Sequence, residues 1–241
     1  MGDFSRGTQL IVALDVDGFD KAKQLVDLLK EDVDFFKVGS QLFTASGPAI
    51  VNYIMSCGRH VFLDLKFHDI PNTVANAVAS AVGLNAGSTD DGGGIFMLTV
   101  HISGGEAMLI NAVESAAKHA ERLKVMRPFI VGITVLTSQD KVTNIDQIVL
   151  DKAKVARRCG LDGVVASANE AGIIRQNMGE DFIIVTPGIR PSGAAADDQK
   201  RIATPKDAVA NGSSFIVVGR PIVMADDPAA AARGILDEIA A

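Results

Sequence analysis

The sequence predicts an α/β protein that folds as a (β/α)8 TIM barrel, with residues 1–241 forming one domain. Eight short apolar runs alternate with longer amphipathic or alanine-rich stretches, and this alternation is typical of parallel strands that are each followed by a helix. The chain length agrees with the roughly 250 residues of such barrels. No stretch rich in proline, serine or charge divides the chain, so a second domain is not expected.

The expected elements follow one another in a regular order. The strands are predicted at residues 9–15, 33–39, 61–67, 95–101, 128–136, 162–167, 181–187 and 214–219. The clearest helical patterns between them cover residues 18–30, 71–86, 104–124 and 144–159. The second of these has Pro71 near its start and small apolar residues at helical spacing, which favours a helix that begins there.

A doubly wound open sheet is the alternative architecture. No predicted strand is followed by G-x-G-x-x-G or G-x-x-x-x-G-K-[ST], the loops with which open sheets often bind nucleotides, so the closed barrel is favoured. Residues 85–94, NAGSTDDGGG, interrupt the regular pattern before the fourth strand. Their polar, glycine-rich composition predicts a flexible surface connection.

The net charge and the cysteine content indicate which binding partners and which cellular compartment to expect. A formal net charge of −6 and a pI near 5.2 give no electrostatic reason to expect binding to nucleic acid or to an anionic membrane. Cys57 and Cys159 are far apart, which favours a reducing cytoplasm over a disulfide framework or a zinc site. The first residues lack the pattern of a signal peptide, and no apolar run is long enough to cross a bilayer. A cytoplasmic protein is expected.

Charged residues stand where the first three predicted strands end. They are Asp15, Lys37, Asp64 and Lys66, with Asp69 just beyond the third strand. Because side chains alternate along a strand, Asp15 shares a face with Ile11 and Ala13, Lys37 with Phe35, and both Asp64 and Lys66 with Phe62, and these faces would point into the barrel. Active sites of such barrels lie at the carboxyl ends of the strands. Several charges buried at one end need a reason, so these residues are candidates for catalysis.

Three other polar residues carry weaker signals. His101 ends the fourth strand on the same row as Thr99, which would face the mouth of the barrel, but a histidine satisfied by hydrogen bonds explains it equally well. No catalytic role is assigned to it. His68 is expected either behind the residues that contact a ligand or at the surface. Thr137 falls where a loop after the fifth strand would offer a hydroxyl to a substrate, although an ordinary turn role fits its position equally well.

Two loops are suited to binding a phosphate. Gly219 follows the last strand and would let a ligand approach the backbone, while Arg220 would hold an anion with its two-pronged guanidinium group. A long loop after the seventh strand carries Arg190 and Gln199, and its small residues are typical of a lid that closes over a ligand. Barrels of this class often bind phosphate between these two loops.

Eight motifs in the same order show a resemblance to a known family. They are ALD, FFKVG, DLKFHDIPNT, VHISGG, LTS, TPGIRP, the run Gln199-Lys200-Arg201, and VVGRPI. The chain resembles orotidine 5′-phosphate decarboxylases of the bacterial type. The resemblance implies a barrel of the ribulose-phosphate-binding type, a homodimer with shared active sites, and the conversion of orotidine 5′-phosphate to uridine 5′-phosphate and CO2, the last step of de novo UMP synthesis. It implies no cofactor and no metal.

The resemblance also implies a role for each candidate residue. The family's alternating charge array matches Lys37, Asp64, Lys66 and Asp69. Asp69, together with Ile70 and Thr73, is expected to enter the active site of the partner subunit. Asp15 matches the acid that contacts the ribose, and Thr137 the residue that contacts the pyrimidine. The phosphate grip and lid match Arg190, Gln199, Gly219 and Arg220. The chain departs from the family pattern at 85–94, where the family has a shorter connection.

The residue types fit this chemistry. Loss of CO2 from C6 of the pyrimidine leaves a carbanion that the ring does not delocalise as an enolate, so electrostatic stabilisation and a proton source are needed. Flanking carboxylates favour the charged form of Lys66, which is the expected proton donor. Asp64, two residues earlier, would press against the substrate carboxylate and raise the energy of the ground state.

Two other functions remain alternatives. Magnesium-dependent sugar-phosphate decarboxylases and aldolases of the same barrel group resemble this chain in having Asp-x-Lys-x-x-Asp after the third strand, but they place a glutamate ligand on the second strand. The corresponding residue here is Lys37, whose positive charge would repel a metal ion. A non-catalytic sensor that binds a phosphorylated metabolite through Arg190 and Arg220 is the more distant alternative.

Overall fold

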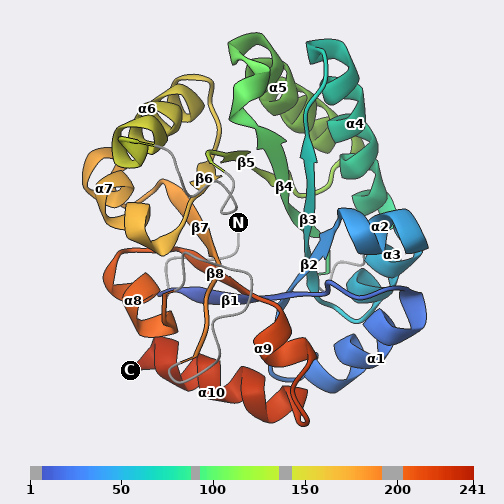
Figure 1. Ribbon diagram of the computed structural model, residues 1–241. Helices are drawn as coiled ribbons and strands as arrows, with labels where there is room; N and C mark the ends of the chain where they lie inside the picture. The colour runs from blue at the N-terminus through green and yellow to red at the C-terminus, as the bar shows by residue number, and fades with distance from the viewer. Residues whose placement is uncertain (1–6, 88–92, 136–142, 192–202) are drawn as a thin grey trace.

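The computed structural model describes residues 7–87, 93–135, 143–191 and 203–241. Within these ranges, eight parallel strands pair in chain order and close into a barrel, with β1 next to β8. The strands form the inner ring in Figure 1. Their bounds are β1 Gln9–Ala13, β2 Phe35–Gly39, β3 His60–Phe67, β4 Ile95–His101, β5 Phe129–Ile133, β6 Gly163–Val165, β7 Ile183–Pro187 and β8 Phe215–Val218. The predicted barrel and the order of its strands are confirmed.

Helices form an outer ring around the strands (Figure 1). They are α1 Phe19–Leu29, α2 Ser40–Ser46, α3 Pro48–Ser56, α4 Pro71–Gly83, α5 Glu106–Leu123, α6 Ile145–Arg158, α7 Ala168–Met178, α8 Pro205–Ala210, α9 Arg220–Val223 and α10 Pro228–Ala240, with 3-10 turns η1 Leu84–Gly87 and η2 Ile102–Gly104. The helix predicted from Pro71 begins at that residue, as expected from the fixed φ angle of proline. None of the described helices combines the length and apolar character needed to span a membrane.

Two hydrophobic cores follow from the alternation of side chains along the strands. On β1, Ile11 and Ala13 belong to the core inside the barrel, whereas Leu10 and Val12 pack in the core between the strands and the helices. β2 repeats the pattern, with Phe35 inside and Phe36 outside. The inward row of each strand therefore fills the barrel from its amino end and leads toward the polar residues at its carboxyl end.

Aromatic rings fill the amino end of the barrel. The ring centroid of Phe35 lies 4.7 Å from that of Phe96 and 5.7 Å from that of Phe215, and the His60 ring stacks on Phe35 at 5.4 Å. Such clusters bury large apolar areas at preferred ring geometries. Among the described residues, these rings fill the interior at this end, whereas the cavity described below opens at the opposite end.

His60 makes the stability of the barrel sensitive to acid. Burial among these rings lowers the pKa of His60, so the unfolded chain takes up a proton at a higher pH than the folded protein does. The free energy of unfolding is therefore expected to decrease as the pH falls below about 6.5, and Tm to fall by a few degrees. Thermal denaturation followed by circular dichroism across this range measures the effect. His60→Phe should weaken the dependence, and an unchanged dependence in this variant would contradict the assignment.

The segment 85–94 differs from the sequence-based expectation at both of its described ends. Asn85 is buried, and its side-chain amide accepts a hydrogen bond from the Ile95 N–H at 2.7 Å and donates one to the Ile95 carbonyl at 3.1 Å. A side chain at Gly93 would collide with the Met55 carbonyl oxygen. These ends are packed against the fold, so the prediction of a surface connection was wrong for them. Residues 88–92 lie outside the described ranges.

Candidate active site

A cavity of about 520 Å³ opens at the carboxyl ends of the strands. Four of the sequence-predicted charges line it, and they come from neighbouring strands: Asp15 follows β1, Lys37 lies in β2, and Asp64 and Lys66 lie in β3. The register places Lys37 beside Ala13 of β1 and Phe62 of β3, so these inward rows end side by side. The four charged side chains therefore meet at one mouth of the barrel, as expected from the sequence.

These four residues form a chain of alternating charge. The Lys37 Nζ lies 2.8 Å from Asp15 Oδ1 and 3.8 Å from Asp64 Oδ2, and Asp64 Oδ2 also accepts a hydrogen bond from Lys66 Nζ at 2.7 Å. The Lys37 and Asp64 side chains are nearly buried, at 11% and 10% exposure, whereas that of Lys66 is 38% exposed. Each buried charge has an opposite partner, as its desolvation requires. Lys66 is the accessible lysine of the two and faces the cavity.

The backbone at Lys66 departs from a regular strand. Leu63 pairs with Leu98 of β4, but the next pair joins Phe67 to Val100, so β3 has two more residues than β4 between these pairs. Lys66 adopts a left-handed conformation with φ of 51°, which costs about 1–2 kcal/mol for a residue other than glycine. Simple alternation predicted correctly that Lys66 lines the cavity, but not the irregular backbone that places it there.

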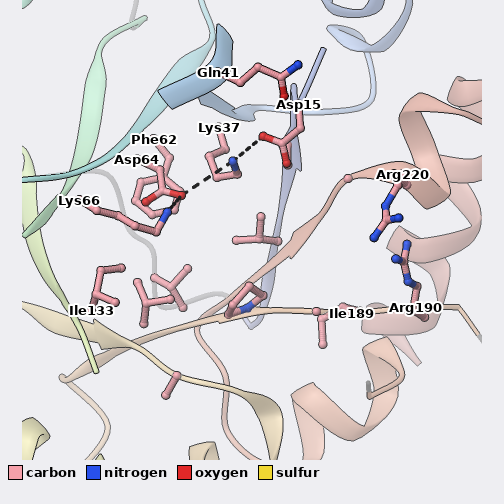
Figure 2. Close-up of a pocket in the computed structure, with 18 of the residues that line it drawn as sticks. Asp15, Lys37, Gln41, Phe62, Asp64, Lys66, Ile133, Ile189, Arg190 and Arg220 are labelled. Carbon is pink, nitrogen blue, oxygen red and sulfur yellow. Dashed lines mark hydrogen bonds and ion pairs between the residues drawn. The ribbon is translucent and has the colours of Figure 1, made fainter. Parts of the chain in front are cut away.

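The opposite wall of the cavity is apolar. It is lined by Ile133, Val135, Val165, Val185 and Ile189, from β5 to the loop after β7. Phe62 lies beside the charge array in Figure 2. The cavity is thus bounded by an apolar wall and an ion-paired wall, a combination suited to a ligand that has both apolar faces and polar groups.

Two arginines line the cavity on the side away from Lys66. Arg190 lies in the loop after β7 and is buried, whereas Arg220 is exposed and begins α9, separated from β8 by Gly219 alone. Their guanidinium groups point toward one another in Figure 2. A Cβ at Gly219 would lie 3.5 Å from the Ala13 side chain, so the backbone here is close to β1. This pair of cations is suited to an anionic group such as a phosphate.

The third predicted carboxylate does not reach the cavity of its own chain. Asp69 is exposed in the loop between β3 and α4, where its Oδ1 accepts a hydrogen bond from the Ile70 N–H at 2.6 Å. Ile70 is 66% exposed, and Thr73, in the first turn of α4, is also exposed. None of the three lines the cavity. All three are exposed and follow the carboxyl end of β3, which is the end of the barrel at which the cavity opens.

Two predicted site residues belong to parts of the chain that the structure does not describe. Thr137 and Gln199 lie outside the described ranges, as does most of the loop that the sequence suggests as a lid. Their expected contacts with the pyrimidine and with the phosphate therefore stay predictions.

The structure does not turn His101 toward the cavity. Its ring stacks on His68 at 5.1 Å, and its Nδ1 lies 2.6 Å from the Ser103 hydroxyl. Burial, followed by the proximity of His68, lowers the pKa of His101. Of the two alternatives that the sequence left open, these contacts favour the histidine satisfied by hydrogen bonds, and the chain turns into η2 directly after it. The reading of His68 as a surface residue agrees with its exposure.

Sequence reasoning missed two residues next to the array. Gln41 lines the cavity near Asp15, and its amide donates a hydrogen bond to Asp17 at 2.9 Å. Its only signal was its position two residues after the end of β2. Thr99 is fully buried on β4 and contacts both Asp64 and Lys66. The alternation of side chains placed Thr99 on the same face of the strand as His101, but no local motif indicated its contacts with Asp64 and Lys66.

The charge array has the ammonium group of Lys37 at the position where a metal-binding site would need a side chain that coordinates the metal ion. Lys37 Nζ lies between Asp15 and Asp64, so these two carboxylates already share a positive charge. Across the described part of the chain, no three or more His, Cys, Asp or Glu side chains are grouped so as to hold a metal ion. Asp15 and Asp64 would have to exchange Lys37 for a cation before they served as metal ligands.

Comparison with known proteins now gives the family. The model of the Orotidine 5′-phosphate decarboxylase / HUMPS family matches residues 8–235. The chain belongs to this family. A curated family relative from Syntrophotalea carbinolica, named orotidine 5′-phosphate decarboxylase, is 46% identical over 241 residues, covering 97% of this chain and 95% of that protein. One of the same name from Moorella thermoacetica is 45% identical over 240 residues, covering 96% and 92%.

Solved structures of the family show the same fold. The crystal structure of orotidine 5′-phosphate decarboxylase from Lactobacillus acidophilus superposes with a TM-score of 0.81 at 37% identity, covering 97% of this chain and all of that one. The resemblance noted from the eight motifs is therefore confirmed at the level of family and fold. The family description names more than one kind of protein, so the reaction has to be argued from the site.

Proposed function

We propose that this protein is an enzyme that decarboxylates orotidine 5′-phosphate to uridine 5′-phosphate and CO2, the last step of UMP biosynthesis. The observation that carries the proposal is the alternating array, in which Asp64 Oδ2 is 2.7 Å from the accessible Lys66 ammonium and Lys37 stands behind it. Relatives at 43–46% identity over nearly the whole chain have this enzyme's name.

The cavity accounts for each part of this substrate. Its phosphate would lie between Arg190 and Arg220, beside the backbone of Gly219, with Gln199 closing over it. Its ribose would meet the Asp15 carboxylate, which is half-exposed while it pairs with Lys37. The orotate ring would then lie along the apolar wall with C6 toward Lys66, and Thr137 would contact the pyrimidine. Anion recognition at one end thus positions the reacting carbon at the other.

Proton transfer from Lys66 completes the reaction. When the bond between C6 and the carboxylate breaks, its electron pair stays on C6 and CO2 leaves. The neighbouring Lys66 ammonium stabilises that negative charge and gives its proton to C6, so the lysine becomes neutral and is recharged from solvent. Asp64 lies close enough to Lys66 to hold the ammonium in place, and its charge would oppose the substrate carboxylate before CO2 is lost.

The remote phosphate has an energetic role. Contacts with two arginines supply binding energy that does not depend on the reacting carboxylate. Part of that energy offsets the repulsion between the substrate carboxylate and Asp64, which disappears when CO2 departs. A substrate that lacks the phosphate is therefore expected to lose kcat as well as affinity.

A direct assay in metal-free buffer tests the proposal. After exhaustive EDTA treatment, the protein is expected to convert orotidine 5′-phosphate to UMP at an undiminished rate, followed by the change in ultraviolet absorbance and by chromatography of the product. Loss of activity that Mg²⁺ restores would favour the magnesium-dependent sugar-phosphate decarboxylases and aldolases, against which the ammonium of Lys37 argues. Tight binding of UMP without any turnover would favour the non-catalytic sensor.

We also propose that two copies of the chain share their active sites. Asp69, Ile70 and Thr73 are exposed at the end of the barrel where the cavity opens, so a second subunit packed on this face would receive the Asp69 carboxylate. An exposed isoleucine beside a carboxylate is suited to such a contact, because it gains from burial. In this arrangement the array of one subunit is completed by its partner, as C2 symmetry allows.

The chain is further proposed to be one catalytic domain that works in the cytoplasm. The barrel closes between β1 and β8, so the described strands share one interior. Cys57 and Cys159 are both free thiols, which suits a reducing compartment. Fractionation of cells that express the tagged protein tests the location.

Gly39 limits the space around the Lys37 ammonium. A Cβ built at this position would lie 3.0 Å from Lys37 Nζ and 3.4 Å from Asp15 Oδ1, so Gly39→Ala displaces the end of a flexible side chain rather than the backbone. We expect kcat to fall about tenfold with little change in Tm, because small displacements of catalytic groups are costly. Gly18→Ala is the matched control, since a Cβ there meets nothing within 4 Å. Equal kcat values in the two variants would show that the position of Lys37 does not matter.

A further inference from the structure

One buried hydroxyl joins the two halves of the Asp64–Lys66 pair. Thr99 lies on β4 with no exposed surface. Its Oγ1 accepts a hydrogen bond from the Lys66 backbone N–H at 2.8 Å and donates one to Asp64 Oδ1 at 3.0 Å. A threonine hydroxyl has a single hydrogen, and here it is directed at the carboxylate. The backbone of one reacting residue and the side chain of the other therefore depend on the same atom.

The irregularity in β3 explains why this bond is needed. Between the pairs Leu63–Leu98 and Phe67–Val100 the ladder between β3 and β4 loses its register, and Lys66 lies inside that interval. The Thr99 hydroxyl takes the role that a strand carbonyl would have for the Lys66 N–H. A lysine at φ 51° persists only where its surroundings hold it. The hydrogen bond from the Lys66 N–H to Thr99 on the neighbouring strand stabilises this conformation.

The same hydroxyl fixes how Asp64 uses its two oxygens. Asp64 Oδ1 accepts a hydrogen bond from the Thr99 hydroxyl. Its other oxygen, Oδ2, forms ion pairs with Lys66 Nζ at 2.7 Å and with Lys37 Nζ at 3.8 Å. Rotation of the carboxylate would break the bond to Thr99 and move Oδ2 away from both ammonium groups. The direction of the Lys66 ammonium into the cavity therefore depends on Thr99 through both its backbone and its ion-pair partner.

We infer that Thr99 is a positioning residue, which sets the geometry of Lys66 and Asp64 for proton transfer without touching the substrate. This inference rests on the proposed decarboxylase function. Thr99 does not line the cavity, so its loss should affect the rate of the chemical step and leave the affinity for product unchanged. A role in packing alone would instead be satisfied by any side chain of the same shape.

Thr99→Val tests this point because it keeps the shape and removes the hydroxyl. We expect kcat to fall about tenfold to a hundredfold, while the Kd for UMP, measured by calorimetry, changes by less than about threefold. Thr99→Ser keeps the hydroxyl and should restore most of the rate. Thr186→Val is the matched control, since it removes another fully buried hydroxyl, which bonds to Ser213 at 2.6 Å and not to the array. A normal kcat in Thr99→Val, or an equal loss in Thr186→Val, would overturn the inference.

A second measurement does not depend on activity. In a crystal structure of Thr99→Val, residue 66 should leave the left-handed region, or the Lys66–Asp64 contact should lengthen; an unchanged backbone and contact would refute the positioning role. If that variant does not fold, Thr99→Cys serves instead, because a thiol is a weak donor and acceptor. A wild-type protein without decarboxylase activity would refute the proposed function alone, and the crystallographic comparison would still decide the role of Thr99.

Discussion

Replacement of Lys66 by alanine is expected to lower kcat for decarboxylation by at least about 10⁴-fold, because it removes both the proton donor and the cation next to the carbanion. The barrel should still fold, since the Lys66 side chain is 38% exposed and contributes little to the core. UMP should still bind, because its phosphate is proposed to lie at Arg190 and Arg220, which line the cavity on the side away from Lys66. Steady-state kinetics, together with calorimetric titration of UMP, measure both quantities.

Two further variants sharpen this result. Lys66→Arg keeps a positive charge but replaces the ammonium with a guanidinium that does not release its proton in proteins, so it too should be nearly inactive. Lys21→Ala removes an exposed lysine of α1 and should have the wild-type rate. Turnover close to wild type in either Lys66 variant would exclude Lys66 as the proton donor.

Two inactive variants are expected to restore activity when they are mixed. Asp64→Asn disables the site of its own chain, whereas Asp69→Asn disables the site of the partner if active sites are shared. After subunits exchange freely, half of the dimers contain one chain of each kind, and each such dimer has one intact site. About a quarter of wild-type activity should therefore return, as the symmetry of a two-fold dimer requires. Activity is measured after denaturation and joint refolding at equal concentrations.

A mixture of Asp64→Asn and Lys66→Ala is the matched control. Both residues line the cavity of their own chain, so every site in a mixed dimer has one defect and no activity should return. Native mass spectrometry of the mixture confirms that subunits have exchanged. If mixed dimers form and the first mixture stays inactive, Asp69 does not serve the neighbouring site.

The barrel was predictable because its signals are local. Along each apolar run, every second side chain points to the same face of the strand, and one face fills the inside of the barrel. Ile11 and Ala13 lie in that inner core, as this alternation requires. The strand at 9–15 was predicted two residues too long, since β1 ends at Ala13 and Asp15 lies in the loop that follows. In that loop Asp15 pairs with Lys37 and stays half-exposed, so its charge is not fully desolvated. The packing of Asn85 was missed because its partner Ile95 lies ten residues away.

The candidate site was predictable as a set of residues but not as a geometry. The sequence by itself determined which charges meet at the mouth, because carboxyl ends of parallel strands meet there, and it placed an ammonium at Lys37 where a metal ligand would be needed. Only the tertiary structure decided how Lys66 is held: its left-handed backbone depends on a hydroxyl from Thr99, 33 residues away on the next strand. Local alternation is a property of one strand, whereas that hydrogen bond exists only once two strands have paired out of register.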